Sequence, residues 1–210
     1  MKEYLKITNE DNMQLMKRYP DNHFDLAIVD PPYGIDVTKM EMGGRKRNKQ
    51  DKKKNWDNAV PTKKYFDELF RVSKNQIIWG GNYFDLPCSQ YFCVWDKGET
   101  MYGRDFAEAE FAWVRKGGTR IYKKNPNQLN RIHPTQKHVS LYQFCLKKYA
   151  KEGFKILDTH LGSGSIAIAV DSVNKIEKMN LTLTACELDT EYYQTATKRI
   201  EEQTTWNSLF

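Results

Sequence analysis

The chain has 210 residues, of which 40% are hydrophobic and 13% aromatic, so we expect one domain over residues 1–210. No apolar run approaches the ~20 residues of a membrane span, and a mean hydropathy of −0.76 indicates a polar surface, which excludes a membrane protein. The first residues lack the apolar segment of a secretory signal, which favours a cytoplasmic location. The four cysteines form no Cys-x-x-Cys pair and no zinc pattern with histidines, so we predict reduced thiols and no metal site.

The net charge of +6 is concentrated in one segment. Between residues 39 and 54, eight basic and two acidic side chains together carry the whole excess. Such a block is typical of a solvated loop, and also of a segment that binds the phosphates of a nucleic acid. The candidates for nucleic-acid contact in it are Lys39, Arg45, Lys46, Arg47, Lys52, Lys53 and Lys54.

Hydrophobic periodicity predicts alternating strands and helices in the first half of the chain. In chain order these are a strand at 4–7, a helix at 10–18, a strand at 25–29, a basic loop at 34–58, a helix at 61–74, and strands at 76–80, 91–95 and 108–114. The last two strands predict an antiparallel hairpin, and the loop between them adds Lys97 and Arg104 as candidates for nucleic-acid contact.

A proline turn follows the strand at 25–29. Asp30-Pro31-Pro32-Tyr33 must end that strand, because its two prolines cannot donate ladder hydrogen bonds. The turn presents a carboxylate, proline carbonyls and an aromatic ring at the edge of the sheet where ligands bind in open α/β folds. This set suits a planar ligand that carries an amino group, such as a nucleobase. The alternative is a stiffened turn with an incidental tyrosine.

The second half continues the alternation of strands and helices. It contains a basic loop at 115–131, a helix at 139–150, a strand at 154–157, a helix at 163–173, a strand at 181–186 and a helix at 190–203. The loop adds Arg120, Lys123 and Lys124 to the nucleic-acid candidates. The whole pattern predicts an α/β doubly wound sheet. The chain ends on a helix where such a unit would be expected to continue with a further strand.

A glycine-rich turn at 158–165 separates a strand from a helix, and Glu187 ends the next strand. The glycines allow close backbone approach, the helix start offers free N–H groups, and an acid such as Glu187 can hold the hydroxyls of a ribose. Gly162-x-Gly164 with Glu187 also meets the dinucleotide fingerprint. Asp158, however, would repel a pyrophosphate and would attract a cation, so the pattern favours S-adenosylmethionine over NAD. A βα turn without a ligand stays open.

Residues 133–137, His-Pro-Thr-Gln-Lys, precede the helix at 139–150. Pro134 restricts His133 to extended geometry, and Thr135 is a candidate N-cap of that helix. The functional interpretation is that Thr135, Gln136 and Lys137 hold the methionine carboxylate of the cofactor.

Taken together and in this order, these motifs resemble the β group of amino-DNA methyltransferases, in which a catalytic half precedes a cofactor half by circular permutation. Residues 77–84 and 94–97 are also similar to small phage and prophage members. The resemblance implies a Rossmann-like sheet in which the strand at 4–7 completes the cofactor half. It divides the domain into a catalytic half at 1–114, a possible DNA-contacting loop at 115–132 and a cofactor half at 133–203.

The resemblance also implies roles for single residues. Asp30 and the Pro31 carbonyl accept hydrogen bonds from the target amino group, and Tyr33 stacks on the flipped base, so 30–33 is the catalytic set with Pro32. Asp11 would contact the cofactor adenine, although Glu10 replaces a common glycine. The cofactor set is Asp11, Asp30, His133, Thr135, Gln136, Lys137, Asp158, Leu161, Gly162, Ser163, Gly164, Ser165, Glu187 and Leu188.

The function that this resemblance implies is methyl transfer from S-adenosylmethionine to the N6 of a flipped-out adenine in DNA. An N4-cytosine enzyme of the same chemistry is the nearest alternative. An RNA or small-molecule methyltransferase, an NAD-dependent oxidoreductase and a non-catalytic nucleic-acid-binding protein are more distant ones. Monomer and homodimer both stay open, as does a restriction endonuclease partner.

Overall fold

The protein was analysed as a computed structural model that describes residues 1–35, 57–104, 107–128 and 131–206. Its strands are β1 (Leu5–Asn9), β2 (Leu26–Val29), β3 (Gln76–Trp79), β4 (Tyr91–Asp96), β5 (Ala109–Val114), β6 (Arg120–Lys123), β7 (Lys155–Asp158) and β8 (Thr182–Glu187). Its helices are α1 (Asn12–Lys17), α2 (Lys63–Val72), α3 (Val139–Tyr149), α4 (Ser165–Glu177) and α5 (Thr190–Trp206), with short 3-10 turns at Gly81–Tyr83 and Glu99–Met101.

All eight strands belong to one sheet of order β1-β8-β7-β2-β3-β5-β4-β6. The five strands from β1 to β3 are parallel to their neighbours. β5 is antiparallel to both β3 and β4. The predicted α/β doubly wound sheet with an antiparallel hairpin is therefore confirmed.

The N-terminal strand completes the far side of the sheet. Leu5 to Asn9 of β1 pair with Leu183 to Glu187 of β8, in parallel and in register. The segment that begins the chain thus supplies the strand that the sequence lacks after Glu187. This arrangement is the one that the permuted motif order predicts.

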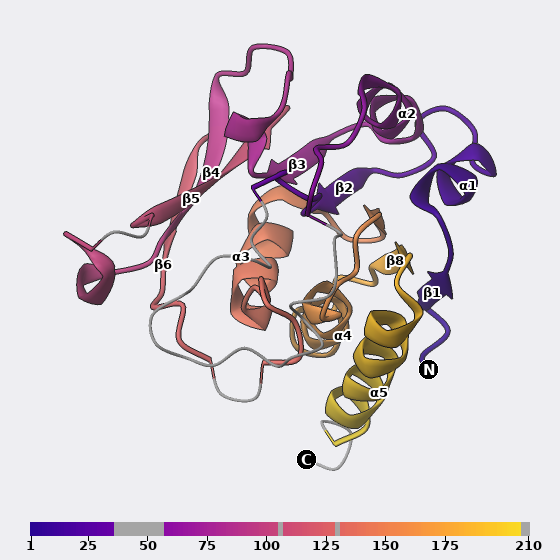
Figure 1. Ribbon diagram of the computed structural model, residues 1–210. Coiled ribbons are helices and arrows are strands. Elements are labelled where there is room, and N and C mark those ends of the chain that lie inside the picture. Colours follow the sequence, from indigo (N-terminus) through magenta and orange to yellow (C-terminus); the bar gives the residue numbers. More distant parts are fainter. Residues whose placement is uncertain (36–56, 105–106, 129–130, 207–210) are drawn as a thin grey trace.

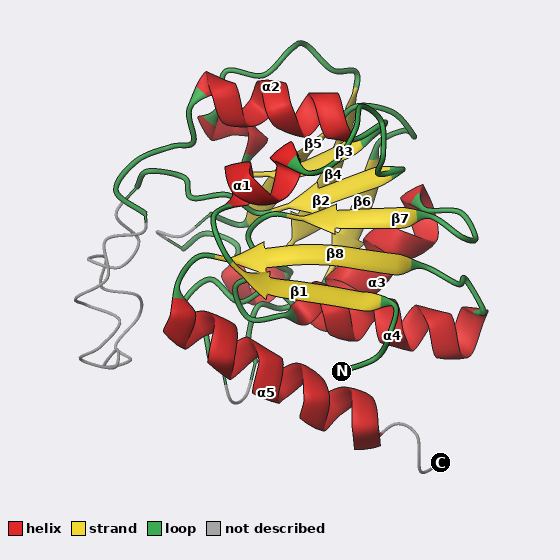
Figure 2. Cartoon of the chain, turned by 90° about the vertical axis from the view of Figure 1, so that its right-hand side faces the viewer, coloured by secondary structure: helices red, strands yellow, loops and turns green. Residues whose placement is uncertain are grey.

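Helices cover both faces of the sheet (Figure 2). α1 and α2 pack on one face over a core that includes Leu15, Phe24 and Leu69. α3, α4 and α5 pack on the opposite face over a second core that includes Trp79, Leu141 and Ile166. Both layers are expected for parallel strands, because such strands are buried on both sides.

The edge beyond the hairpin differs from the prediction. Residues 115–131 were expected to form a loop, but they contain β6, which pairs in parallel with β4 and extends the sheet by one strand (Figure 1). The short pattern Arg-Ile-Tyr-Lys carries only two apolar residues between basic ones, and Ile121 is 66% exposed. Such an edge strand is held by backbone pairing to β4 and has little hydrophobic signal in its sequence.

The central pair, β7 and β2, fixes the position of the site. The chain leaves β7 through α4 toward β8 on one side, and it leaves β2 through α2 toward β3 on the other. The strand order reverses between these two strands, and ligands of open α/β sheets bind outside the carboxyl ends at such a point. Asp158 ends β7, and Asp30 directly follows β2.

Candidate active site

The turn after β2 is anchored by a buried carboxylate that sequence reasoning missed. β2 is fully buried and stops at the two prolines. The buried Asp57 accepts hydrogen bonds from the backbone N–H groups of Tyr33 at 2.7 Å and Gly34 at 3.0 Å. Charge-assisted bonds of this kind hold a turn in one geometry. Asp57 follows a long polar stretch, and no pattern in the sequence marks it.

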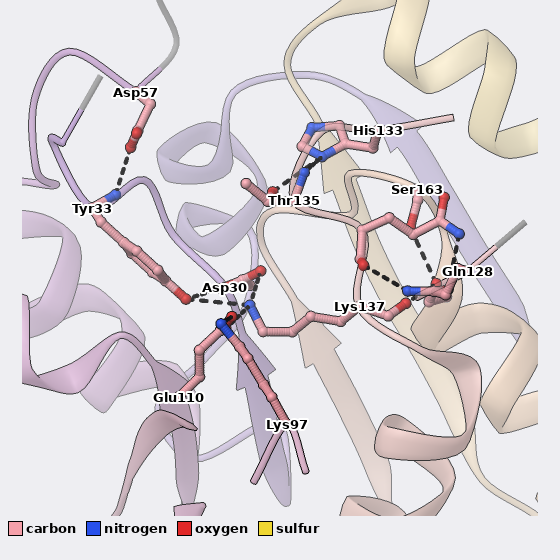
Figure 3. Close-up of polar contacts among 12 residues, drawn as sticks. Asp30, Tyr33, Asp57, Lys97, Glu110, Gln128, His133, Thr135, Lys137 and Ser163 are labelled. Atoms are coloured by element: carbon pink, nitrogen blue, oxygen red, sulfur yellow. Dashed lines mark hydrogen bonds and ion pairs between the residues drawn. The ribbon is translucent and has the colours of Figure 1, made fainter. Parts of the chain in front are cut away.

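Both carboxylate oxygens of Asp30 have partners within the protein (Figure 3). The Tyr33 hydroxyl donates to Oδ1 at 2.6 Å, and the Lys137 ammonium lies 2.5 Å from Oδ2. Lys137 also donates to the Tyr33 hydroxyl at 3.2 Å. Asp30 is thus oriented by a tyrosine of its own turn and a lysine from the segment before α3.

Lys137, which was predicted to hold the methionine carboxylate of the cofactor, is buried between acidic groups. Its side chain is 3% exposed, and besides Asp30 it pairs with Glu110 of β5 at 3.3 Å. Burial lowers the pKa of Lys137, but the charges of Asp30 and Glu110 outweigh that effect and raise the pKa overall. Lys137 is therefore a cation in this site.

Lys97, a predicted nucleic-acid contact, is largely buried beside an acidic residue. Its side chain is 13% exposed and lies 3.0 Å from Glu110, with its ammonium 5.7 Å from the ring centre of Trp95. Burial raises the pKa of Glu110, but Lys137 and Lys97 lower it by more, so the carboxylate stays ionised. The alternating row Asp30, Lys137, Glu110 and Lys97 is called the charge row below.

The ring of Tyr33 is already stacked in this structure. The ring of Tyr83 lies parallel to it within 12°, at a centroid distance of 4.9 Å, and Tyr83 is 45% exposed. Gly80 lies so close that a Cβ there would be 2.2 Å from Cε1 of Tyr33. An exposed aromatic side chain thus rests on the ring that was predicted to stack on a base.

The glycine turn after β7 surrounds a buried carboxyl group. Asp158 accepts a hydrogen bond from the His160 N–H at 3.0 Å. Burial raises the pKa of Asp158 to about 8, and the nearby carboxylates of Asp30 and Glu187 add to the rise, which the more distant charge of Lys137 only partly offsets. Glu187 accepts from the Gly162 N–H at 2.9 Å, so the end of β8 is tied to the turn. A cation placed against Asp158 would favour its ionised form.

The two glycines of the turn have different roles. A Cβ on Gly162 would be in ordinary van der Waals contact with the His160 carbonyl at 3.8 Å and with the His133 ring at 3.9 Å. A Cβ on Gly164 would lie 2.7 Å from Cδ1 of Ile200 in α5, and Gly164 has a positive φ of 74°. Gly164 thus lets α5 pack closely against the start of α4, whereas at Gly162 the positive φ of 53° is what favours glycine.

The remaining residues of the predicted cofactor set lie in the glycine turn or just after β8. The Ser165 hydroxyl donates to the Lys137 carbonyl at 2.8 Å, and Arg199 donates to the Ser163 carbonyl at 2.6 Å. Leu161 is buried, and Leu188 is exposed just beyond β8. These bonds connect the glycine turn to the segment that carries Lys137.

Residues 133–137 do not cap α3 as expected. The helix begins at Val139 with His138 as its N-cap, and Thr135 contacts the His133 ring at 3.2 Å. Gln136 is buried and exchanges hydrogen bonds with Gln128, which fastens the preceding loop. The Gln136 N–H donates to the His133 carbonyl at 3.2 Å and closes a turn, so the helix starts three residues later than a Thr135 cap would place it.

Asp11, which was predicted to contact the cofactor adenine, caps a helix. Its carboxylate accepts the N–H groups of Met13 at 2.9 Å and Gln14 at 3.2 Å, so it is the N-cap of α1. The next residue, Asn12, contacts Nε2 of His160 at 3.1 Å. Burial lowers the pKa of His160 to about 3, so this ring is neutral and accepts from the Asn12 amide. Asn12 joins the end of β1 to the glycine turn.

The predicted nucleic-acid contacts are only partly within the described residues. Lys39, Arg45, Lys46, Arg47, Lys52, Lys53 and Lys54 lie outside them. Arg104 and Arg120 are exposed, Lys123 pairs with Glu99 at 3.0 Å, and Lys124 donates to Ser140 at 2.9 Å. Arg120 and Lys123 belong to β6 at the sheet edge, beside the β4–β5 hairpin (Figure 1).

Comparisons with known proteins agree with this geometry. The family model for N6 and N4 amino-methylases, described as DNA methylase, matches residues 45–198. The chain belongs to the DNA methylase family. A search of curated proteins found no match.

Solved DNA methylases share the fold at low sequence identity. The M1.HpyAVI–SAM complex aligns with a TM-score of 0.59 and 18% identity, over 93% of this chain and 98% of that chain. TTHA0409, a modification methylase from Thermus thermophilus complexed with S-adenosyl-L-methionine, gives 0.58 and 15%, over 95% and 94%. The cytosine-N4-specific PvuII DNA methyltransferase gives 0.55 and 10%, over 96% and 93%. This methylase therefore has the Rossmann-like fold of these proteins over nearly its whole length.

Other general properties follow from the described residues. None of their helices is long and apolar enough to cross a membrane. Within the same ranges, no group of three His, Cys, Asp or Glu side chains is arranged to hold a metal ion.

Because its pKa is raised in the folded protein, Asp158 should make the free energy of unfolding fall as the pH rises. Its pKa is about 8 in the folded protein and near 3.8 when unfolded, so between these values only the folded state holds the proton. The free energy of unfolding then decreases by up to about 1.4 kcal/mol per pH unit between pH 5 and 8. Asp158→Asn should remove this slope, as measured by urea unfolding at several pH values. Parallel pH profiles for both proteins would contradict the assignment.

Gly80→Ala should lower the thermal stability by more than backbone strain alone predicts, because the new Cβ would overlap the Tyr33 ring. Gly103 has nearly the same positive φ, 70° against 69° at Gly80, but a Cβ there would meet nothing within 4 Å. Gly103→Ala therefore measures the left-handed strain of about 1–2 kcal/mol, and Gly80→Ala should cost about 1–3 kcal/mol more from overpacking. Thermal unfolding of the two variants compares these costs. Equal losses would mean that the Tyr33 ring moves away freely.

Proposed function

We propose that this DNA methylase transfers a methyl group from S-adenosylmethionine to the N6 of adenine in DNA. The observation that carries the proposal is the meeting of two carboxyl groups at the switch point of the sheet. Asp30 follows β2 and is oriented by Lys137, and Asp158 ends β7 and is buried where its neutral form is favoured. A neutral amino acceptor suits the first position, and a cationic methyl donor suits the second.

The residues around Asp158 fit the cofactor. A sulfonium or ammonium near Asp158 would restore the ionised form that burial disfavours. Gly162 adopts a positive φ of 53° in the turn after β7, and Glu187, fixed by the Gly162 and Asp189 N–H groups, supplies a carboxylate suited to the hydroxyls of a ribose. The His133 ring packs on the Tyr192 ring with a centroid distance of 4.5 Å, and it lies beside the same turn. S-adenosylmethionine, when bound, supplies an electrophilic methyl group.

The catalytic turn acts on the accepting nitrogen. An exocyclic amino group is a poor nucleophile, because its lone pair is delocalised into the ring. Asp30 and the Pro31 carbonyl accept hydrogen bonds from it and favour a tetrahedral nitrogen. Transfer of a methyl group to this nitrogen would release the sulfur as a neutral thioether and leave positive charge on the nitrogen until it loses a proton to solvent, and the Asp30 carboxylate would stabilise that charge by preorganised electrostatics.

The base must leave the duplex to reach this turn, at a cost of a few kcal/mol. Tyr33 offers an aromatic face whose stacking returns about 1–3 kcal/mol. Tyr83 occupies a stacked position on Tyr33, so the incoming base either displaces this exposed ring or stacks beside it. The basic loop at 34–58, Arg104 and the β6 edge contact the DNA backbone.

Adenine is preferred to cytosine because the turn begins with Asp30. In the β group of amino-DNA methyltransferases, which the motif order resembles, Asp at this position accompanies adenine and Ser accompanies cytosine. The phage-type motifs at 77–84 and 94–97 support the same subgroup. Sequencing of DNA after treatment with the protein and S-adenosylmethionine distinguishes the two bases and gives the target site.

Asp30→Ala should lower methyl transfer to DNA by about 10²-fold or more, because the preorganised acceptor is lost. The dissociation constant for the cofactor should change by less than about threefold, which corresponds to less than about 1 kcal/mol. The assay is transfer of labelled methyl groups, with cofactor binding measured by calorimetry. Asp67→Ala, which removes an exposed ion pair of α2, is the matched control. An Asp30→Ala protein that keeps most of its activity would refute the mechanism.

Tyr33→Phe should reduce kcat less than Tyr33→Ala. Phenylalanine keeps the stacking ring but removes the hydroxyl that donates to Asp30 at 2.6 Å, whereas alanine removes both. We expect about a tenfold loss for the single hydrogen bond and a larger loss for the ring. Steady-state rates of both variants on the same DNA test the order. Equal losses would assign the whole effect to the hydroxyl.

A further inference from the structure

The charge row contains two residues, Glu110 and Lys97, to which the proposed methyl transfer gives no part. Asp30, Lys137, Glu110 and Lys97 come from four separate parts of the chain: the turn after β2, the segment before α3, β5 and the loop after β4. Figure 3 shows the Lys137 ammonium between Asp30 and Glu110, with Lys97 against Glu110. Bringing four charges together in a largely buried place is costly unless each is paired.

Lys137 has two carboxylate partners at unequal distances. Its ammonium is 2.5 Å from Oδ2 of Asp30 and 3.3 Å from Oε2 of Glu110. An amino group that donates to Oδ2 of Asp30 competes with the ammonium for that oxygen. If the Lys137 ammonium gives up its contact with Oδ2 of Asp30, it does not become an unpaired buried charge, because it already lies 3.3 Å from Glu110.

A second cation weakens the attraction of Glu110 for Lys137, so that Lys137 is not drawn away from Asp30 entirely. Lys97 lies 3.0 Å from its other oxygen, Oε1, and its cation offsets part of the negative charge of Glu110. The cation of Lys137 therefore stays close to both carboxylates. It balances the charge of Asp30 in a place where Asp158 and Glu187 add further acidic groups.

We propose that Glu110 is a positioning residue that shares Lys137 with Asp30, so that Asp30 can accept the target amino group without stranding the buried ammonium. This inference rests on the proposed methyl transfer to an amino group. Lys97 sets how strongly Glu110 draws Lys137. Neither residue touches the reacting atoms, and both act through Lys137.

The kinetic test is Glu110→Gln, which keeps the size of the side chain and removes its charge. Asp30 is then the only carboxylate that pairs with Lys137, so kcat should fall at least about tenfold, which corresponds to one charge-assisted contact. The dissociation constants for S-adenosylmethionine and DNA should stay within about threefold. Glu110→Asp should restore part of kcat. Glu177→Gln, which breaks the exposed pair between Lys147 and Glu177 on α3 and α4, is the matched control.

A second variant separates positioning from folding. Glu110→Gln strands the cation of Lys97, which by itself destabilises the fold. Lys97→Met/Glu110→Gln removes that cation as well, so its thermal stability should recover relative to Glu110→Gln while kcat stays low. A double variant that regains both stability and kcat would show that Glu110 is merely structural.

A stability cycle tests the sharing of Lys137 without any activity. Asp30→Asn and Glu110→Gln each leave Lys137 with one carboxylate, but the double variant leaves a buried ammonium with neither. Urea unfolding should therefore show a loss for the double variant that exceeds the sum of the single losses. Additive losses would overturn the inference even if the wild type methylates DNA. A coupled cycle in a wild type that transfers no methyl group would instead refute the proposed function.

Discussion

The contact between the Lys137 ammonium and the Asp30 carboxylate is the interaction on which the site depends. It joins the two halves of the fold, since Asp30 follows β2 and Lys137 precedes α3. The pair is buried and carries a second acid, Glu110, and a second cation, Lys97. A buried pair of this kind contributes little net stability by itself, but removing one partner is strongly destabilising. The arrangement therefore fixes the geometry of the site, and substitution of a single charged partner should destabilise it.

The sheet explains why this pair and Asp158 meet. Parallel strands end at the same edge, and the strand order reverses between β7 and β2, so the Asp30 and Asp158 carboxyl groups are neighbours without being close in sequence. Their environments differ in charge. Asp30 has the Lys137 ammonium within hydrogen-bonding distance, whereas Asp158 accepts a backbone N–H and has a raised pKa. One carboxyl group is prepared for a neutral amino group and the other for a cation, which is the division of labour that methyl transfer requires.

Much of the fold could be predicted from local patterns. Alternating apolar runs indicated the elements of the parallel region, and the order of the motifs indicated the place of β1 beside β8. The edge strand β6 could not be predicted, because its pairing with β4 is a long-range backbone interaction and its sequence is half basic. The helix expected at 139–150 is α3 at Val139–Tyr149, but its N-cap is His138 and not Thr135, because residues 133–136 form a turn that a propensity argument does not contain.

The candidate site was predictable where a motif marked it and not elsewhere. Asp30, Tyr33, Asp158 and Glu187 stand in recognisable sequence contexts. Asp57 and Glu110 do not, since they reach the site only through tertiary contacts. The position of Lys97 was not predictable either, because a lysine in a glycine-containing loop suggests a phosphate contact, whereas its burial beside Glu110 depends on the tertiary position of β5.

The chemical position of the transferred methyl group is the most direct test of the proposed reaction. Unmethylated duplex DNA would be incubated with the protein and S-adenosylmethionine that carries a deuterated methyl group, digested to nucleosides and examined by mass spectrometry. We expect deuterated N6-methyladenine. Label on carbon 5 of cytosine, or no labelled nucleoside at all, would contradict transfer to an amino nitrogen held by Asp30.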